Sequence, residues 1–131
     1  MPMVHLSDSA AAPLVLLAGE ASEGAAELLR EAGCRVRTAA SPAALLRLAG
    51  SAPAPQLILL GETVADQPGL SLLSRLRDEA ATRAIPVLFV AGGDEELALA
   101  LGASDCLSLP LRPLVLLARV QTQLRLGELR D

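Results

Sequence analysis

The feature that most constrains the fold is a short run of four large aliphatic residues, Leu57 to Leu60, between Pro55 and Gly61. Such a run is typical of a strand covered on both faces, as strands are in the parallel sheet of an α/β domain. In these sheets the ligand site lies just beyond the carboxyl ends of the strands. Gly61 holds that place after this strand, and it has no side chain with which to do chemistry.

Strand-like and helix-like segments alternate along the rest of the chain. The further strand-like segments are Leu14–Leu17, Cys34–Thr38, Ile85–Val90 and Asp105–Ser108. Each of the five strands is followed by a segment with helical periodicity, and these segments begin near Ser22, Pro42, Gly69, Asp94 and Pro113. This alternation predicts an α/β fold, a doubly wound (βα)5 five-stranded parallel sheet of flavodoxin-like topology.

The length of 131 residues fits one domain. Residues 1–12 are rich in Ser, Ala and Pro, and we expect them to be a mobile N-terminal leader. The domain is predicted to span residues 13–126. Residues 127–131 are interpreted as the start of a linker.

Composition excludes several classes of function. The net charge of −4 argues against a nucleic-acid surface, and all eleven basic residues are Arg, which excludes lysine chemistry. No apolar run is long enough for a membrane span, and the N-terminus does not resemble a signal peptide. Cys34 and Cys106 lack the spacing of a redox or metal motif and are read as buried, reduced thiols of a cytoplasmic protein.

Several motifs resemble the receiver domain of response regulators, the phosphoryl-accepting module of two-component signalling in bacteria. The resemblance runs from about Leu14 to Arg125. It is strongest over Gly102–Leu111, which is similar to the family's Gly-Ala-x-Asp-Tyr-Leu-x-Lys-Pro-Phe. Further matching segments are Pro55–Leu60, Gly69-Leu70-x-Leu72-Leu73 and Ile85-Pro86-Val87-Leu88.

The resemblance also implies that the phosphorylation chemistry is missing. Ala18 and Gly19 stand where the family has the acidic pair that binds Mg²⁺, and Gly61 stands in place of the phosphoacceptor Asp. Ala91 replaces the Thr or Ser that contacts the phosphoryl group, and Leu109 replaces the Lys. Phosphoryl transfer needs a carboxylate, a cation held by oxygen ligands, and donors for the phosphoryl oxygens. The predicted vestigial pocket therefore comprises Ala18, Gly19, Glu20, Gly61, Ala91 and Leu109, with Cys106 at the position of the aromatic switch residue.

The predicted function is a degenerate receiver that cannot be phosphorylated and acts as a protein–protein interaction module. We expect no enzymatic activity, no cofactor and no metal. The partner is expected to be another protein or a second copy of the chain, held through the fourth helix, the fifth strand and the last helix. A covalently linked C-terminal output domain is a further expectation, and neither nucleic acid nor membrane is expected to bind. The predicted interaction residues are Leu97, Leu99, Leu101, Leu107, Leu117, Val120 and Leu124.

Alternatives remain open at this stage. The emptied pocket at Ala18, Gly61, Ala91 and Leu109 could accept a small ligand, which would make the domain a sensor. Glu20 and Glu62 are the acids expected near the pocket. They are either solvated loop residues or remnants of a weak cation site, and Glu62 could instead mimic a phosphoryl group.

Three smaller features complete the sequence reading. Gly92–Glu96 resembles the signature of diguanylate cyclases, but we expect it only to leave a strand and begin a short helix. His5 has no predicted partner. The resemblance implies a cis peptide bond before Pro110.

Overall fold

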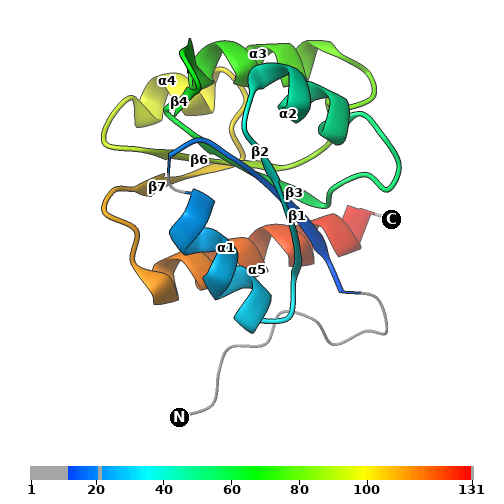
Figure 1. Ribbon diagram of the computed structural model, residues 1–131, viewed down its shortest axis with the longest axis vertical. Coiled ribbons are helices and arrows are strands. Elements are labelled where there is room, and N and C mark those ends of the chain that lie inside the picture. Colours follow the sequence, from blue (N-terminus) through cyan, green and yellow to red (C-terminus); the bar gives the residue numbers. More distant parts are fainter. Residues whose placement is uncertain (1–11, 21, 131) are drawn as a thin grey trace.

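The computed structural model describes residues 12–20 and 22–130. A central sheet separates two layers of helices, with α1 and α5 on one face and α2, α3 and α4 on the other (Figure 1). The elements are β1 (Leu14–Ala18), α1 (Ser22–Glu31), β2 (Arg35–Ala39), α2 (Pro42–Ala49), β3 (Leu57–Gly61), β4 (Thr63–Val64), β5 (Gln67–Pro68), α3 (Gly69–Asp78), β6 (Val87–Ala91), α4 (Glu95–Ala100), β7 (Asp105–Ser108) and α5 (Pro113–Arg130).

The main sheet has five strands in the order β2-β1-β3-β6-β7, and every neighbouring pair is parallel. The predicted fold class is confirmed. From its sequence Glu62–Pro68 is expected to be a polar loop, but β4 and β5 form a two-residue antiparallel pair within it, so that expectation is wrong. The pair is too short and too polar for its alternation to show in the sequence.

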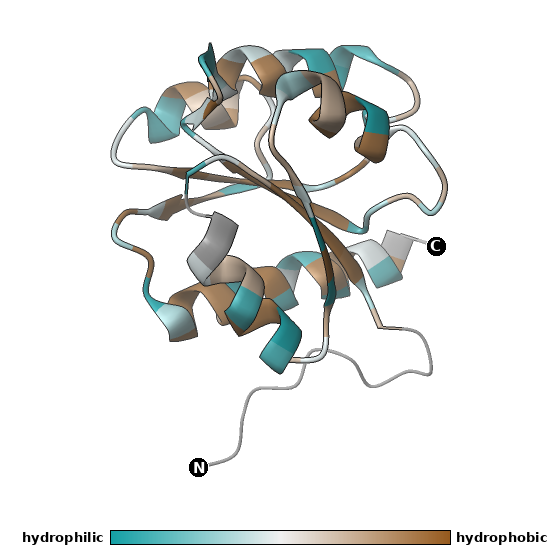
Figure 2. Ribbon diagram, viewed as in Figure 1, coloured by the Kyte–Doolittle hydropathy of each residue, from teal (hydrophilic) through white to brown (hydrophobic). Residues whose placement is uncertain are grey.

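Hydrophobic residues are concentrated along the strands and on the inner sides of the helices (Figure 2). β1, β3 and β6 are buried along their whole length, as the aliphatic runs predict. β2 is an edge strand, where Arg35 and Arg37 are exposed and only Ala39 is buried. Charged side chains on an edge strand disfavour pairing with another chain.

The beginning of α2 shows how the sequence sets an element boundary. The hydroxyl oxygen of Ser41 accepts a hydrogen bond from the backbone N–H of Ala44 at 3.1 Å, and Pro42 opens the helix. This is the predicted N-cap followed by Pro at the first helical position.

The helix face that α5 presents to the sheet corrects one prediction. Leu117, Val120 and Leu124 were predicted to lie on an interaction surface, but they are buried in the core between α5, α1 and the sheet. Leu107 of β7 was placed on the same surface and is only 3% exposed, in the same core. The physical reason is that these residues form the apolar stripe by which α5 covers the sheet.

The ends of the predicted domain lie partly outside the described residues. Most of the predicted leader, residues 1–11, falls there, together with His5. The predicted linker start is helical as far as Arg130, the last residue of α5. Among the residues that the structure describes, no helix combines the length and apolar character needed to cross a bilayer.

Candidate functional site

The predicted vestigial pocket lies at the carboxyl edge of the sheet. Ala18, Gly61 and Ala91 are the last residues of β1, β3 and β6, and all three are buried. Gly61 is in register with Val90, and Ala91 is in register with Ser108 of β7. The parallel topology therefore brings these positions to one edge, where none of the three provides an oxygen or nitrogen in its side chain.

Glycine backbones fill this edge. A Cβ atom added at Gly19, whose φ is +106°, would lie 2.8 Å from the Cα of Gly61. One added at Gly61 would lie 3.2 Å from the backbone nitrogen of Glu20, and one added at Gly69 would lie 2.0 Å from the carbonyl oxygen of Gly61. The backbone at Gly19 and Gly69 thus approaches its neighbours more closely than a side chain allows, and a side chain at Gly61 would require the loop after β1 to shift by a few tenths of an ångström.

Leu109 does not share a cavity with these glycines. Its backbone N–H donates to the carbonyl of Ala91 at 3.3 Å, but its side chain is 42% exposed and lines a different cleft beside Cys106 and Pro110. A separate cleft of about 290 Å³ lies on the other side of the edge, next to Gly19, Glu20, Ala40 and Thr63. The single apolar pocket predicted from Ala18, Gly61, Ala91 and Leu109 is therefore wrong as a description of the space.

Glu20 and Glu62 each bind a neighbouring loop. The hydroxyl of Thr63 donates to Oε1 of Glu20 at 2.6 Å, and the backbone N–H of Gly92 donates to Oε1 of Glu62. The two carboxylates are thus hydrogen bonded, in place of the purely solvated state that was the simplest expectation. In the described part of the chain, no three His, Cys, Asp or Glu side chains come together as a metal site would require.

A groove of about 490 Å³ runs between α4, β7 and α5. Its floor is β7, and its walls carry the exposed apolar side chains of Leu99, Leu109 and Val115. The remaining lining residues include two acids and two bases, Glu95, Asp105, Arg112 and Arg119. A face of this composition can exclude water at its centre and pair charges at its rim.

Polar contacts join the walls of the groove. The hydroxyl of Ser108 donates to Oε1 of Glu95 at 3.1 Å, and the thiol of Cys106 lies 3.8 Å from the carbonyl oxygen of Glu95. On the other side, Nε of Arg119 lies 3.6 Å from Oδ2 of Asp105. This last pair is solvent-exposed, so it orients the two side chains and adds little stability.

The two thiols occupy different environments. Burial raises the pKa of the Cys34 thiol from 9.0 to about 11. Burial also raises the pKa of Cys106, and the negative charges of Glu95 and Asp105 raise it further. Both cysteines are free, so the thiol forms are favoured at neutral pH, and neither is an activated nucleophile.

Of the predicted interaction residues, the two that lie in α4 are exposed. Leu97 and Leu99 are 49% and 50% exposed, whereas Leu101, just after the helix, is half-buried against the core. The sequence reading missed Val115 and Arg119, which line the groove from α5. The signal was present, because both lie on the opposite side of α5 from the buried Leu117, Val120 and Leu124.

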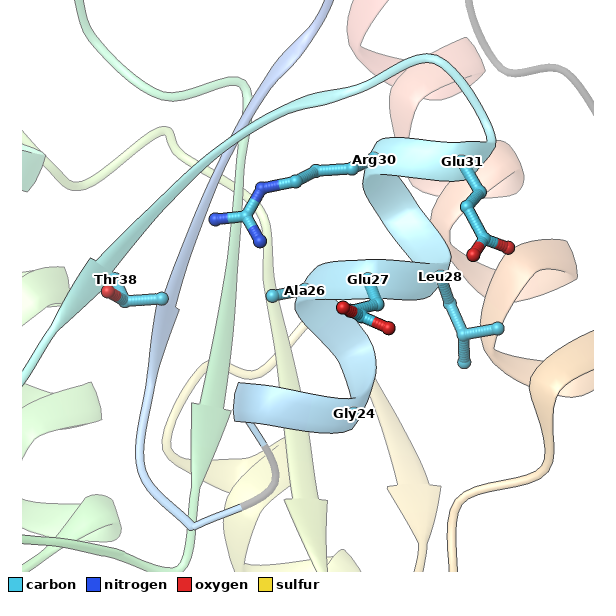
Figure 3. Close-up of a pocket in the computed structure, with 7 residues that line it drawn as sticks. All are labelled: Gly24, Ala26, Glu27, Leu28, Arg30, Glu31 and Thr38. Atoms are coloured by element: carbon cyan, nitrogen blue, oxygen red, sulfur yellow. The ribbon is translucent and has the colours of Figure 1, made fainter.

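An open hollow of about 730 Å³ lies between α1 and β2 (Figure 3). Arg30 extends from α1 towards the strands, whereas Glu27 and Glu31 do not point towards Thr38 of β2 (Figure 3). The polar groups do not converge on a common point, so this hollow has no arrangement suited to catalysis or to metal binding.

Solved structures resemble this arrangement closely. The chain superimposes on a putative response regulator from Chloroflexus aurantiacus with a TM-score of 0.81 and 27% identity, over 88% of this chain and 99% of that one. The fold is that of a response-regulator receiver domain. No protein-family model and no curated protein matches the sequence.

Two further receiver structures place the chain in context. A receiver domain of a sensor histidine kinase from Pseudomonas aeruginosa, with a magnesium ion in its active site cleft, gives a TM-score of 0.78 at 23% identity, over 88% of this chain and 99% of that one. NtrX from Brucella abortus also gives a TM-score of 0.78 at 23% identity. The match includes 92% of this chain but only 28% of the NtrX chain. In NtrX, the part that matches this chain is one portion of a longer polypeptide.

The receiver fold also bears on two smaller predictions. The Leu109–Pro110 peptide bond is cis, as the resemblance implied, and so is the Ala52–Pro53 bond. Gly92–Glu96 follows β6 and begins α4, which is the placement expected for a loop and helix start. The likeness of this segment to a cyclase signature therefore has no counterpart in its structure.

Proposed function

We propose that this chain is a degenerate receiver domain of a two-component signalling protein and binds other proteins without being phosphorylated. In this proposal it is not an enzyme and needs no cofactor. Ala18, Gly61 and Ala91 have no carboxylate in their side chains, and in the described residues no three His, Cys, Asp or Glu side chains come together as a Mg²⁺ site would require. The observation that carries the interaction role is the groove between α4, β7 and α5, where Leu99, Leu109 and Val115 remain exposed.

The proposed partner is a second copy of the chain. Both charge signs occur among the residues that line the groove: Glu95 and Asp105 are acidic, and Arg112 and Arg119 are basic. A twofold interface requires a self-complementary surface, and a rim with both signs meets that requirement. A longer polypeptide with an output domain is consistent with the proposal, since receiver folds occur within regulators such as NtrX.

The association test uses size-exclusion chromatography with light scattering. Leu99→Glu and Val115→Glu are expected to weaken self-association by about tenfold each, because each places a charge at the apolar centre. Leu129→Glu is the matched control, since Leu129 is 78% exposed and does not line the groove. A chain that is monomeric at every concentration, or equal weakening by the control, would contradict homotypic binding through this groove.

The phosphorylation test uses acetyl phosphate or beryllofluoride with Mg²⁺. No change is expected in the oligomeric state or in the backbone NMR signals of Gly61, Ala91 and Leu109. A shift of those signals that depends on both reagents would overturn the claim that the domain works without phosphorylation.

A further inference from the structure

The α4 helix is attached to the domain by little apolar burial. It has six residues, and only Ala98 among them is buried. Leu97 and Leu99 on either side of it are exposed. Ala98 and the half-buried Leu101, which follows the helix, are its apolar anchors. So small an apolar contact gains little from the hydrophobic effect, and the position of the helix therefore depends also on polar contacts at its ends.

Those polar contacts come from other elements. At the carboxyl end, Nε of Arg77 in α3 donates to the carbonyl oxygen of Gly102 at 2.8 Å. At the amino end, Oε1 of Glu62 accepts the backbone N–H of Gly92, two residues before Asp94. Asp94 itself has a left-handed conformation, with φ of +63°, and its side chain makes no capping hydrogen bond to the helix. Glu62 is therefore the described side chain that fixes the loop into α4.

We propose that Glu62 is a latch: its carboxylate, placed at the end of β3, holds the loop before α4 and so keeps the α4 wall of the groove closed over β7. β3 and β6 are neighbouring parallel strands, so Glu62 reaches Gly92 directly across the sheet edge. A charged acceptor makes the stronger kind of hydrogen bond to a backbone N–H. The negative group that fixes this loop is then the carboxylate of Glu62, which is always present in the chain.

The latch connects to the groove through α4. Glu95, the first residue of α4, contacts Ser108 and Cys106 on β7. When the loop before α4 is released, these contacts are lost together, and Leu99 moves away from the groove with the helix. Cys106 is half-buried and lines the groove, and opening of α4 would expose its thiol further, so this cysteine can report on the opening.

The test measures the rate at which a thiol reagent labels the native cysteines, with mass spectrometry as the readout. Labelling is carried out at two pH values, so that a change in thiol ionisation can be separated from opening of the helix. Glu62→Ala is expected to label Cys106 about tenfold faster, because it removes a charge-assisted hydrogen bond from a weakly packed helix. Glu62→Gln, which keeps an oxygen acceptor without the charge, is expected to fall between. Cys34, which is buried in the core, reports global unfolding and is expected to keep its rate.

Glu20→Ala is the matched control. Glu20 is also a carboxylate at this sheet edge, but it binds Thr63 and not the loop before α4. Labelling of Cys106 is expected to stay at the wild-type rate in this variant. The latch is overturned if Glu62→Ala has no effect, if Glu20→Ala has the same effect, or if Cys34 and Cys106 accelerate equally.

The importance of the latch for binding rests on the proposed function, whereas the labelling test does not. If groove substitutions leave association unchanged while Glu62→Ala still exposes Cys106, the interaction role fails and the latch stands. If groove substitutions weaken association but Cys106 labels at the wild-type rate in Glu62→Ala, the latch fails and the interaction role stands.

Discussion

The carboxyl edge of the sheet and the groove between α4, β7 and α5 lie next to each other but are built differently. At the edge, Gly19, Gly61 and Gly69 bring three backbone segments into close contact, and a side chain at any of the three would displace a neighbouring segment. In the groove, Leu99, Leu109 and Val115 stay exposed above a strand. The edge is closely packed and has small residues at the ends of β1, β3 and β6, whereas the groove presents an accessible apolar surface.

The difference indicates that the chemistry at the sheet edge and the apolar groove can be separated within a receiver fold. Chemistry at the edge would depend on a few side chains, whereas this edge has the small residues Ala18, Gly61 and Ala91. The groove depends on the position of whole elements, which the hydrophobic core maintains. A receiver fold can therefore lose the first without losing the second.

The substitution with the largest expected effect on stability tests the boundary between the core and the groove. Leu107→Ala is expected to lower the free energy of unfolding by about 3 kcal/mol, because Leu107 is buried on the α5 side of β7. Leu109→Ala, two residues later, is expected to change it by less than about 0.5 kcal/mol, since its side chain is exposed. Urea denaturation of both variants measures the contrast, and similar losses would erase the boundary between the two regions.

A second substitution tests the glycine packing at the edge. Gly69→Ala is expected to cost about 2 kcal/mol or more, because its Cβ would lie 2.0 Å from the carbonyl oxygen of Gly61 and force the backbone apart. Gly93→Ala is the control, since a Cβ there has no neighbour within 4 Å. Thermal and urea unfolding give the values, and a neutral Gly69→Ala would mean that the edge is loosely packed.

The two cysteines extend the comparison to pH. Because the Cys34 pKa is raised from 9.0 to about 11, the unfolded chain loses this proton first as the pH rises. Stability is therefore expected to fall above pH 9, by roughly 1 kcal/mol between pH 8 and pH 10 from this group alone. Cys34→Ala should remove this part of the pH dependence of the unfolding free energy, whereas Cys106→Ala should remove much less of it. Urea unfolding at each pH measures both. An unchanged slope in Cys34→Ala would contradict the role of its burial.

The smallest expected effect comes from restoring the acceptor residue. Gly61→Asp is expected to cost about 1 kcal/mol, since the loop at Glu20 must move by a few tenths of an ångström. No acyl phosphate should form with acetyl phosphate and Mg²⁺, because Ala18 and Gly19 provide no side-chain ligands for the ion. Mass spectrometry after incubation checks this, and a magnesium-dependent gain of one phosphoryl group would show that the edge is less closed than the glycine contacts indicate.

The sheet and most of the core could be predicted from the sequence because short aliphatic runs and helical periodicity report burial directly. The prediction failed on α5, where Leu117, Val120 and Leu124 face the sheet while Leu114, Leu126 and Leu129 face outwards. A helix with apolar residues on both sides does not reveal from its sequence which side is covered.

The candidate site could be predicted only as a set of missing groups. The sequence places Gly61 and Ala91 after buried strands, but it does not reveal that Gly19, Gly61 and Gly69 touch. It also does not show that Glu62 binds the N–H of Gly92, since these residues are thirty positions apart and the contact depends on the order of the strands. Contacts between loops follow from the fold, and local pattern does not encode them.

The exposure of five of the six residues in α4 has a consequence for how this protein can change over time. Because only Ala98 is needed by the core, the other five positions can accept mutations at almost no cost to folding. Under the proposed function these positions would contact a partner. Binding preference could then diverge between descendants of this protein while the scaffold beneath the helix is preserved.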